Sequence, residues 1–528
     1  MLLPSHNTLN NLATRALVCS TLQQPFLNGT KILAFSAEPN AQYVPAPVIA
    51  PYMTGVLGYA PVVNVSFCNV TMTYTHTNQN DAVTLQVWLP DDWNGRFQGT
   101  GGGGWLGGTF DPRLLPSILT GYAAASTDAG TAQKPLQPGS PSTWGLSSPG
   151  NVNWATLQDF SSVALYELSV FGKALISQSY GREANYSYWN GCSQGGRQGM
   201  MLAQRYPDAF DGILAAAPAL NWVPVMTSLY QPQAVMNGLG EFPPNCEFEA
   251  ITLRAIAACD GLDGVYDGII DQPAVCRFDP FTVVGEPIAC GNRTNATISQ
   301  TAAIVANETW SSLLTPQGRP LYPGFTYDSE ITSVTDTDCA AAGNCSSTAW
   351  DIGADWFQYF IAKNASFDLR TITAANISQL VHAGYQEYDS IIGTNDPDLT
   401  NLKNSGTKLL SWHGSADNYI PVGGSTQYYD RVSALDAGVH EYFKLFVAPG
   451  VAHCGGGVGA APIAILDQLV AWVENGTSPQ TVPAKGTRPV NGTLLERNLC
   501  AYPSISVYQG GNASSASSYG CINPTRLT

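Results

Sequence analysis

The spacing of hydrophobic and polar residues predicts strands and helices that alternate along the first part of the chain. Residues 70–77 and 84–89 alternate in polarity or are β-branched, and the polar residues 78–81 between them predict a turn. Residues 154–178 carry apolar side chains at helical spacing, which predicts a helix. Shorter strand-like runs occur at 96–100, 122–126, 186–189 and 212–216. Because strands that alternate with helices form largely parallel sheets, the pattern indicates an α/β fold.

This pattern stops at about residue 221 and returns near residue 401. The stretch between them is rich in Cys, Pro, Gly and glycosylation signals and shows no strand–helix alternation. The α/β pattern resumes in runs at 407–412, 442–447 and 463–474. We therefore expect one α/β domain made of residues 1–220 and 401–528, interrupted by an inserted lid domain at residues 221–400.

Composition and charge narrow the class of protein. Charged residues make up 12% of the 528 residues, about half the usual share, and the net charge is −16. An acidic chain without a Lys/Arg cluster is a poor partner for nucleic acid or an anionic membrane, and no apolar run approaches the roughly 20 residues of a membrane span. The twelve cysteines predict disulfides formed in an oxidising compartment. Asn-x-Ser/Thr acceptors for glycosylation recur at Asn28, Asn64, Asn69, Asn185, Asn292, Asn307, Asn364, Asn376, Asn475, Asn491 and Asn512.

From these features we expect a glycosylated, secreted, extracellular protein. The N-terminus does not have the form of a signal peptide, because Arg15 and several polar residues interrupt the apolar stretch before Cys19. We expect the native leader to be missing or replaced in this sequence.

The segment Gly191-Cys192-Ser193-Gln194-Gly195-Gly196 is the strongest chemical signal in the chain. It follows a strand-like run and precedes a helical one, as the Gly-x-Ser-x-Gly nucleophile elbow of an α/β-hydrolase does. Its glycines permit a sharp turn that exposes the serine hydroxyl. The pattern indicates an enzyme in which Ser193 attacks an acyl group.

A serine nucleophile needs a base, usually a histidine, and a carboxylate that orients the histidine. His453 lies in a turn just after the last predicted core strand, and Asp417 lies in a loop just after the preceding strand. Ser193, Asp417 and His453 follow one another in the chain order that α/β-hydrolases use. Taken alone, Asp417 could cap a helix and His453 could face solvent. Together with Ser193 they predict a catalytic triad.

Two cysteines flank this predicted triad. Cys192 precedes the predicted nucleophile and Cys454 follows the predicted base. If Ser193 and His453 are hydrogen-bonded, the two cysteines are close enough to form a disulfide. The alternatives are two buried free thiols or, less in keeping with the elbow, a thiol nucleophile.

The Cys-Ser pair, the Asp and the His-Cys pair resemble the signature of the tannase and feruloyl esterase family. The similarity extends over nearly the whole chain, from the region of Cys68 to Cys521, and the elbow segment 191–199 is highly specific to the family. The resemblance implies an α/β-hydrolase domain with a large inserted lid, and hydrolysis of phenolic acid esters. Bacterial mono-hydroxyethyl terephthalate hydrolase shares this architecture.

An enzyme of this kind also needs hydrogen-bond donors for the oxyanion of its tetrahedral intermediate. The backbone N–H of Gln194, the residue after the predicted nucleophile, is one candidate. The glycine run 101–104 is similar to glycine-rich oxyanion loops, and Gly103 is the favoured second donor. The alternative is a flexible surface loop. A phosphate cradle is disfavoured because no Lys-Ser/Thr pair follows.

The acidic, glycine-spaced segment 259–271 predicts a calcium site, because Ca²⁺ prefers carboxylate and carbonyl oxygens. Three carboxylates without nearby cations repel one another unless a cation binds them. The spacing is not that of an EF-hand, and it resembles the lid calcium site of the family. The alternative is a solvated acidic turn. The resemblance implies a structural Ca²⁺ held by the side chains of Asp260, Asp263 and Asp267 and the carbonyls of Val265 and Ile269.

Sequence alone does not fix which of the remaining cysteines pair. We expect one disulfide across the acidic segment and one that holds the C-terminal tail. The expected pairs are Cys19–Cys68, Cys246–Cys290, Cys259–Cys276, Cys339–Cys345 and Cys500–Cys521.

The leading functional hypothesis is a secreted serine carboxylic ester hydrolase for small phenolic esters, free or attached to plant polysaccharide or tannin. Feruloyl- or chlorogenate-type esters are favoured over the galloyl esters of a tannase. A catalytically inactive hydrolase fold used for binding is the alternative from another class, and a peptidase has no specific support. Lid aromatics that could stack on a phenolic ring, although each is more simply explained as lid core, are Trp350, Trp356, Tyr359 and Phe360.

Overall fold

The computed structural model of this chain forms two compact units. Unit 1 contains residues 1–147, 153–215 and 400–408, and unit 2 contains residues 148–152, 216–399 and 409–528. The structure describes residues 18–44, 65–132, 139–291, 293, 295–339, 345–348, 351–487 and 492–523. Three predicted glycosylation acceptors and one lid aromatic lie outside the described residues, namely Asn64, Asn292, Asn491 and Trp350.

Unit 1 is built on a mixed sheet with the strand order β1-β2-β3-β5-β4-β8-β9. The strands β1, β2, β3 and β5 pair antiparallel, whereas β4 pairs in parallel with β5 and with β8. All six strand-like runs of this part of the sequence are strands in the structure. The bounds are β1 Thr30–Tyr43, β2 Val65–His76, β3 Val83–Pro90, β4 Arg96–Thr100, β5 Ala123–Thr127, β8 Tyr186–Cys192 and β9 Gly212–Ala216.

The first strand, β1, is not predicted from the sequence. None of its 14 residues is buried, and its apolar residues Ile32 to Phe35 are consecutive instead of alternating with polar ones. It is held instead by a long antiparallel ladder with β2, from Thr30 opposite His76 to Tyr43 opposite Val65.

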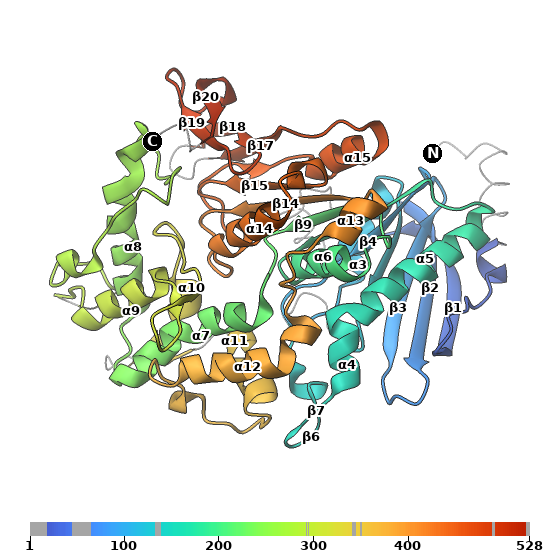
Figure 1. The fold of residues 1–528 in the computed structure, drawn as a ribbon, viewed down its shortest axis with the longest axis horizontal. Helices are drawn as coiled ribbons and strands as arrows, with labels where there is room; N and C mark the ends of the chain where they lie inside the picture. The colour runs from blue at the N-terminus through green and yellow to red at the C-terminus, as the bar shows by residue number, and fades with distance from the viewer. Residues whose placement is uncertain are drawn as a thin grey trace. The chain divides into compact units, whose positions relative to one another are not determined.

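Helices α3 (Asp111–Leu119) and α5 (Ala164–Tyr180) cover opposite faces of this sheet. On β4, Gln98 accepts a hydrogen bond from Ser117 of α3, whereas the preceding residue, Phe97, lies against α5. Successive residues of a strand point to opposite faces, so the two helices lie on different sides. Figure 1 shows α5 lying across the strands of this unit.

The helical run predicted at 154–178 is present but is not uniform. It consists of α4 (Trp154–Gln158), the π-helical segment η2 (Asp159–Val163) and α5. A π-helical turn is wider than an α-helical one, and such turns are frequent at functional sites. The spacing of apolar residues does not reveal this segment, because one face of the run is apolar whether its turns are α-helical or π-helical.

Residues 216–399 of unit 2 are mainly helical, which is consistent with the loss of strand–helix alternation in their sequence. The helix α7 is buried over most of its length, and its end forms an apolar core with α8 and α9. Because α7 is apolar on nearly all sides, it has no amphipathic stripe, and it is not predicted among the helices of this part. Their bounds are α7 Trp222–Leu239, α8 Asn245–Cys259, α9 Gln300–Trp310, α10 Thr332–Thr335, α11 Asp351–Asp355 and α12 Ile377–Ile392.

The C-terminal part of unit 2 returns to strands and helices. The strands β14 (Lys408–Gly414) and β15 (Phe443–Ala448) pair in parallel, and α14 (Gly423–Leu435) connects them. Both strands and the following helix α15 (Ile465–Asn475) match the predicted runs. Two small antiparallel sheets complete this part of the chain in Figure 1, with the orders β16-β17-β18 and β19-β20. The bounds are β16 Ala461–Pro462, β17 Thr481–Thr487, β18 Leu494–Cys500, β19 Ile505–Tyr508 and β20 Tyr519–Ile522.

All twelve cysteines are disulfide-bonded. The five pairs expected from the sequence are confirmed, and they are Cys19–Cys68, Cys246–Cys290, Cys259–Cys276, Cys339–Cys345 and Cys500–Cys521. Complete pairing of this kind is typical of proteins that fold in an oxidising compartment.

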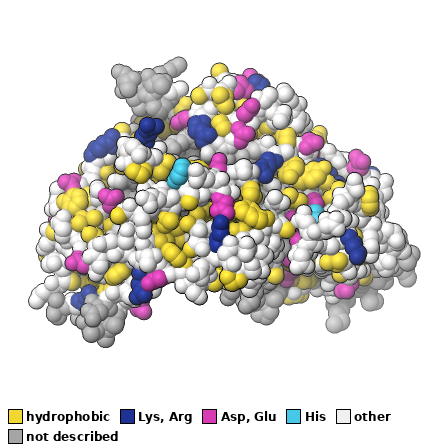
Figure 2. Space-filling model, turned by 60° about the horizontal axis from the view of Figure 1, so that its bottom comes forward, with side chains coloured by type: hydrophobic (Ala, Val, Ile, Leu, Met, Phe, Trp, Pro, Cys, Tyr) yellow, Lys and Arg dark blue, Asp and Glu magenta, His cyan; other side chains and the backbone are white. Residues whose placement is uncertain are grey.

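The surface carries few charges, as the composition requires. On the face shown in Figure 2, acidic and basic side chains of the described residues are scattered among larger areas of uncharged ones. In the described part of the chain, no helix has the length and apolar character that crossing a membrane demands.

Candidate active site

Ser193 lies in the sharp turn between β8 and α6 (Gln194–Arg205). Its backbone angles, φ 65° and ψ −122°, fall in a region that L-residues rarely adopt. A Cβ on Gly191 would collide with the backbone of Gly195, so the turn closes only around glycine. A serine held in a strained strand-to-helix turn has the geometry of a nucleophile elbow.

A buried arginine fixes the first turn of α6. The Arg197 side chain is fully buried, and its Nε donates to Oε1 of Gln194 at 2.7 Å. Its two terminal nitrogens donate to the carbonyls of Ser161 and Phe160, both in η2, at 3.1 Å. Burial, and after it the charge of Arg205, lowers the pKa of Arg197 to about 9. Sequence reasoning misses this contact, although a single charge in an otherwise uncharged helix start is a usable signal.

The glycine loop 101–104 packs directly on the start of α6. The N–H of Gly195 donates to the carbonyl of Gly102 at 3.0 Å. Gln198 fixes the loop from two sides: its Oε1 accepts the N–H of Gly102 at 3.0 Å, and its Nε2 donates to the carbonyl of Gly107 at 2.6 Å. The loop is therefore an ordered part of unit 1, and the alternative of a flexible surface loop does not describe it.

Both predicted oxyanion donors belong to this junction. Gln194 is the first residue of α6, and the N–H of a first helical residue has no acceptor within its own helix. Gly103 is half-buried, and open space surrounds the position where a Cβ would stand. Unit 1 thus brings Ser193, Gln194 and the glycine loop into one neighbourhood, while the role of the two N–H groups stays a prediction.

Asp417 and His453 come together in unit 2, just beyond the C-terminal ends of β14 and β15. The Nδ1 atom of His453 lies 2.8 Å from Oδ2 of Asp417. The Asp417 side chain is fully buried, whereas that of His453 is 14% exposed. The His453 backbone N–H donates to Oδ1 of Asn418 at 3.3 Å, and its ring packs edge-on against Tyr419. With Nδ1–H donated to the carboxylate, Nε2 is the basic nitrogen of the ring.

A second histidine, His413, contacts the same carboxylate. Its Nε2 lies 3.1 Å from Oδ2 of Asp417 and 3.0 Å from the carbonyl oxygen of Ile420. Both atoms are acceptors, so Nε2 carries a proton, and Nδ1 lies 2.8 Å from the hydroxyl of Ser425. His413 is completely buried within β14. Sequence reasoning misses its role, although a histidine four residues before Asp417 is a signal that could have found it.

Asp417 is held as a carboxylate. Its Oδ1 accepts the backbone N–H groups of Tyr419 at 2.9 Å and Ile420 at 2.8 Å. Burial acts to raise the pKa of Asp417, but His453 and His413 outweigh burial and hold that pKa well below the usual range of an aspartate. The arrangement can therefore orient a histidine and stabilise its cation.

Ser193 belongs to unit 1, whereas Asp417 and His453 belong to unit 2. The assembly of the three into one triad stays a prediction. Cys192 and Cys454 are both disulfide-bonded, which removes the alternative of free thiols and of a thiol nucleophile. Their pairing with each other also stays a prediction.

The acidic segment 259–271 forms a compact turn after α8, closed by the disulfide Cys259–Cys276. The Oδ1 of Asp260 accepts the N–H groups of Asp267 and Gly268, each at 2.9 Å. The Oδ1 of Asp263 accepts the N–H of Val265 at 2.9 Å. The backbone of the segment itself therefore holds the carboxylates of Asp260 and Asp263 in place.

The donor set fits a cation. The Oδ2 atom of Asp263 is buried and has no hydrogen-bond partner, and Asp271 lies close to it. Burial, and after it this neighbouring Asp263, raises the pKa of Asp271 to about 8. The negative charge of Asp267 is already compensated by Arg497 of β18 (Leu494–Cys500), which lies 3.4 Å from its Oδ2. The sequence does not predict this ion pair.

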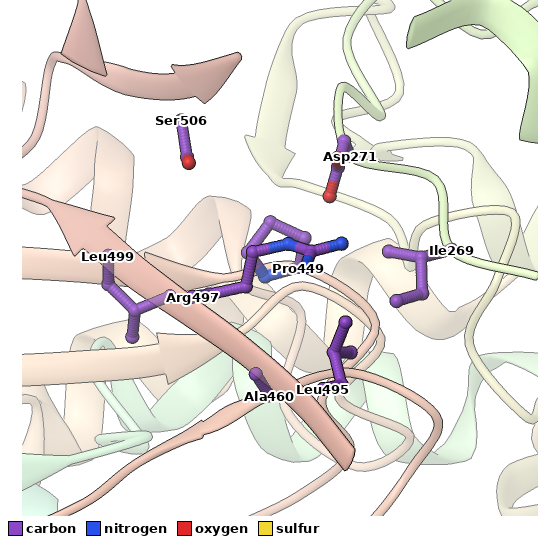
Figure 3. Close-up of a pocket in the computed structure, with 8 residues that line it drawn as sticks. All are labelled: Ile269, Asp271, Pro449, Ala460, Leu495, Arg497, Leu499 and Ser506. Atoms are coloured by element: carbon purple, nitrogen blue, oxygen red, sulfur yellow. The ribbon is translucent and has the colours of Figure 1, made fainter. Parts of the chain in front are cut away.

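A small pocket lies beside the acidic segment, and Ile269 and Asp271 of that segment line it. Figure 3 shows the guanidinium of Arg497 pointing toward the side chains of Ile269 and Asp271, with Leu495 and Ser506 on other walls. Its lining includes neither Asp417 nor His453. The pocket is therefore formed by the acidic segment and by the C-terminal part of unit 2 that packs against it.

Three of the four predicted lid aromatics can be placed. Trp356, Tyr359 and Phe360 are buried, with 0%, 9% and 0% of their surface exposed. Trp356 and Phe360 also pack against each other and against Tyr388 of α12. They are core residues of unit 2, in agreement with the simpler explanation that lid aromatics form the lid core.

Comparisons with known proteins decide the family. A model of the family "Tannase and feruloyl esterase" matches residues 68–522. The chain belongs to the tannase and feruloyl esterase family. It is 42% identical to a probable feruloyl esterase of Arthroderma benhamiae, over 95% of this chain and 93% of that protein. It is 28% identical to the tannase of Aspergillus oryzae, over 94% of this chain and 90% of that protein.

Solved structures agree with the family assignment. The tannin acyl hydrolase of Aspergillus niger superimposes with a TM-score of 0.85 at 28% identity, covering 98% of this chain and 96% of that one. The chain has the α/β-hydrolase fold of these family members, as the sequence predicts. It is a carboxylic ester hydrolase, and its substrates are small esters.

Proposed function

We propose that this chain is a secreted serine esterase that cleaves phenolic acid esters, with feruloyl- and chlorogenate-type esters favoured, through an acyl-enzyme on Ser193. The observation that carries the proposal is the buried hydrogen bond between Asp417 and His453 in the chain order of an α/β-hydrolase triad. The strained turn at Ser193 supports the nucleophile, and the complete disulfide pairing supports secretion.

Each group has a defined role in the proposed acylation step. Nε2 of His453 takes the proton of the Ser193 hydroxyl while its oxygen bonds to the ester carbonyl carbon. Asp417 orients the ring through Nδ1 and stabilises the cation that forms. The N–H groups of Gln194 and Gly103 receive the developing oxyanion. His453 then protonates the alcohol oxygen as its bond to the carbonyl carbon breaks.

Deacylation repeats these roles with water as the nucleophile. His453 removes a proton from water, whose oxygen bonds to the acyl carbon of the Ser193 ester. Collapse of the second tetrahedral intermediate breaks the bond to the Ser193 oxygen, which takes its proton back from His453. The phenolic acid leaves, and the enzyme returns to its starting state.

The preference for feruloyl-type esters is supported by similarity. The relative that is 42% identical is named a probable feruloyl esterase, whereas the tannase is 28% identical. A tannase acting on galloyl esters is the second candidate, supported by the likeness to a tannin acyl hydrolase structure. A catalytically inactive binding protein is disfavoured, because the serine and the acid–base pair are all present in the sequence.

We also propose that the acidic segment binds a structural Ca²⁺. The side chains of Asp260, Asp263 and Asp267 and the carbonyls of Val265 and Ile269 would hold the ion. Bound there, Ca²⁺ would neutralise the facing carboxylates and cross-link the turn. It would take no part in the chemistry, since an elbow serine needs no Lewis acid.

The test compares hydrolysis of methyl ferulate, chlorogenate and methyl gallate by the purified protein and by Ser193→Ala. We expect the cinnamate esters to be cleaved with the higher kcat/KM. The Ser193→Ala protein should lose at least about 10³-fold in kcat with unchanged circular dichroism. Preference for gallate would make the enzyme a tannase, and wild-type turnover by Ser193→Ala would remove the serine mechanism.

A further inference from the structure

A second polar cluster lies in unit 1, between the sheet and the α4–η2–α5 run. His76 is the last residue of β2, Asp81 follows in the turn to β3, Asp159 begins η2 and Glu167 lies on α5. None of these residues is used by the proposed esterase mechanism. Asp81, Asp159 and Glu167 are 7%, 2% and 5% exposed, so three carboxyl groups are buried around one imidazole.

The contacts centre on the imidazole ring of His76. Its Nδ1 lies 2.6 Å from Oδ2 of Asp81 and 3.7 Å from Oδ1 of Asp159. These three side chains can each offer one atom to a common metal ion, because those atoms lie within 4.8 Å of one another. On the other side of the ring, Nε2 lies 2.8 Å from Oε1 of Glu167.

Asp159 provides an independent sign that the cluster faces a ligand. Its Oδ2 atom is buried and has no hydrogen-bond partner. A buried polar atom without a partner costs free energy. Asp159 is also the first residue of a π-helical turn, a local irregularity that is frequent at functional sites.

The hydrogen bonds on the Nε2 side of the His76 ring match those that usually orient a metal-binding histidine. Such a histidine almost always donates its second ring N–H to a carboxylate or carbonyl, which fixes the ring orientation. Here Glu167 accepts from Nε2, and Glu167 is held in turn by the hydroxyl of Tyr74, which donates to its Oε2 at 2.7 Å. Tyr74 and His76 are two residues apart on β2, so they face the same side of the sheet.

We propose that Nδ1 of His76 and the carboxylates of Asp81 and Asp159 form a binding site for a divalent transition ion of the zinc type. One nitrogen and two oxygens suit Zn²⁺, whereas Ca²⁺ favours oxygen donors alone. The ion replaces the proton that Nδ1 shares with Asp81, while Nε2–H stays with Glu167. The fourth position belongs to solvent, which reaches the cluster at the 13% exposed side chain of His76.

The observed distances are compatible with such an ion after small movements. A tetrahedral ion with bonds of about 2.05 Å sets its donor atoms about 3.3 Å apart. The Nδ1–Asp81 distance of 2.6 Å and the Nδ1–Asp159 distance of 3.7 Å lie on either side of that value. To reach that spacing, the Asp81 oxygen would move away from Nδ1 by about 0.7 Å and the Asp159 oxygen would move toward it by about 0.4 Å.

The site is independent of the proposed calcium site and of the esterase. The acidic segment 259–271 belongs to unit 2 and offers oxygen donors, whereas this cluster belongs to unit 1 and includes an imidazole. An ion bound here would tie the turn after β2 to the helical run that covers the sheet. Its role would be structural, in the packing of that run.

The test uses Co²⁺ as a spectroscopic probe of the full-length, chelator-treated protein, with 1 mM Ca²⁺ present to occupy the acidic segment. We expect one equivalent of Co²⁺ to bind, with visible absorption bands of a four- or five-coordinate ion. Asp159→Asn keeps the shape of the side chain and removes its charge, and it should weaken Co²⁺ binding by at least 10-fold. Glu167→Gln should weaken it by about 10- to 100-fold through the orientation of His76.

Asp263→Asn is the matched control, because it removes a carboxylate from the acidic segment and leaves this cluster intact. Its Co²⁺ spectrum and affinity should equal those of the wild type. Circular dichroism verifies that each variant is folded, and Glu167→Gln decides the matter if Asp159→Asn does not fold. Absence of Co²⁺ binding by the wild type, or equal binding by wild type and Glu167→Gln, would overturn the proposal.

Discussion

Asp417 is the residue on which the polar contacts of the candidate acid–base pair converge. Four N–H groups reach its carboxylate, two from the rings of His413 and His453 and two from the backbone of Tyr419 and Ile420. Hydrogen bonds to the charged form favour ionisation, so they offset the cost of burying this carboxylate. The charge that orients His453 is therefore present even in acidic solution.

Asp417→Asn is expected to lower kcat by about 10⁴-fold, because an amide no longer holds the histidine in the tautomer that accepts the serine proton. The KM for methyl ferulate should change little, since the carboxylate is buried away from solvent. Steady-state kinetics on the folded variant measure both constants. A kcat within tenfold of the wild-type value would exclude Asp417 as the triad acid.

The same variant has a pH-dependent effect on stability. The pKa of Asp417 is lower in the folded state than its unfolded value of about 3.9. Its carboxylate therefore stabilises the fold above about pH 4, and this contribution is lost as the pH falls through the folded pKa. Urea unfolding should show the wild type more stable than Asp417→Asn at pH 6, with a gap that narrows below pH 4. A gap independent of pH would contradict this assignment.

The places of the candidate residues along the chain could be predicted from the sequence. Ser193 directly follows β8, whereas Asp417 lies three residues after β14 and His453 lies five residues after β15. A strand end next to glycine is a local signal. The contacts of His413 and Arg197 could not be predicted in the same way. Arg197 contacts Ser161 and Phe160, which lie 36 and 37 residues away in the sequence. The contacts of His413 are closer in the sequence, but they depend on the complete burial of its ring, which the local pattern does not record.

At the scale of elements, the glycine loop and α6 form one packed junction. Gly101 lies where a Cβ would meet the Gly195 backbone, whereas a Cβ on Gly103 would meet nothing within 4 Å. The two positions are two residues apart in the same loop, yet only one of them requires glycine for space. This difference provides a matched pair of substitutions.

Gly101→Ala should lower kcat about 10²-fold or more, because displacing the loop from α6 moves an oxyanion donor out of reach. Gly103→Ala should keep kcat within about threefold, since alanine retains the backbone N–H. Steady-state hydrolysis of methyl ferulate measures both effects.

The thermal midpoints of the two alanine variants serve as the control for folding. Overpacking at Gly101 should cost about 1–3 kcal/mol, which lowers the midpoint without unfolding the protein at assay temperature. Equal losses of kcat in both variants would show that the loop does not act through a placed N–H group.

Two kinds of element are predictable from this sequence, namely elements with one buried face and short strands made of consecutive apolar or small residues. The strands β2 and β3 and the helix α15 carry apolar residues at a regular period, whereas β5 and β9 are short strands buried at every position. By contrast, β1 has no buried residue and α7 is buried on nearly all sides, so neither has such a period. The π-helical η2 is missed for a different reason, because its hydrogen-bond pattern leaves the apolar face unchanged.

At the scale of the molecule, bound Ca²⁺ is expected to act on stability and not on chemistry. Chelation with EGTA should lower the thermal midpoint, and Ca²⁺ added back should restore it. A free Ca²⁺ concentration 100 times the Kd contributes about 2.7 kcal/mol. Differential scanning calorimetry with and without Ca²⁺ measures the shift, and turnover at 25 °C should persist after chelation.

Asp263→Asn should abolish most of this Ca²⁺-dependent shift, because it removes the carboxylate whose Oδ2 has no partner. Asp338→Asn, which changes an exposed aspartate of the same unit, is the matched control and should leave the shift intact. A midpoint that Ca²⁺ does not move in the wild-type protein would remove the calcium proposal.

The complete oxidation of the cysteines has a practical consequence for studies of this protein. Because no cysteine carries a thiol, a maleimide dye added under non-reducing conditions has no native target. A single cysteine introduced at an exposed position, such as Leu435 at 65% exposure, would be labelled alone. Paired with a second such position on unit 1, it would give fluorescence distances between the two units in solution, with no need to remove any native cysteine.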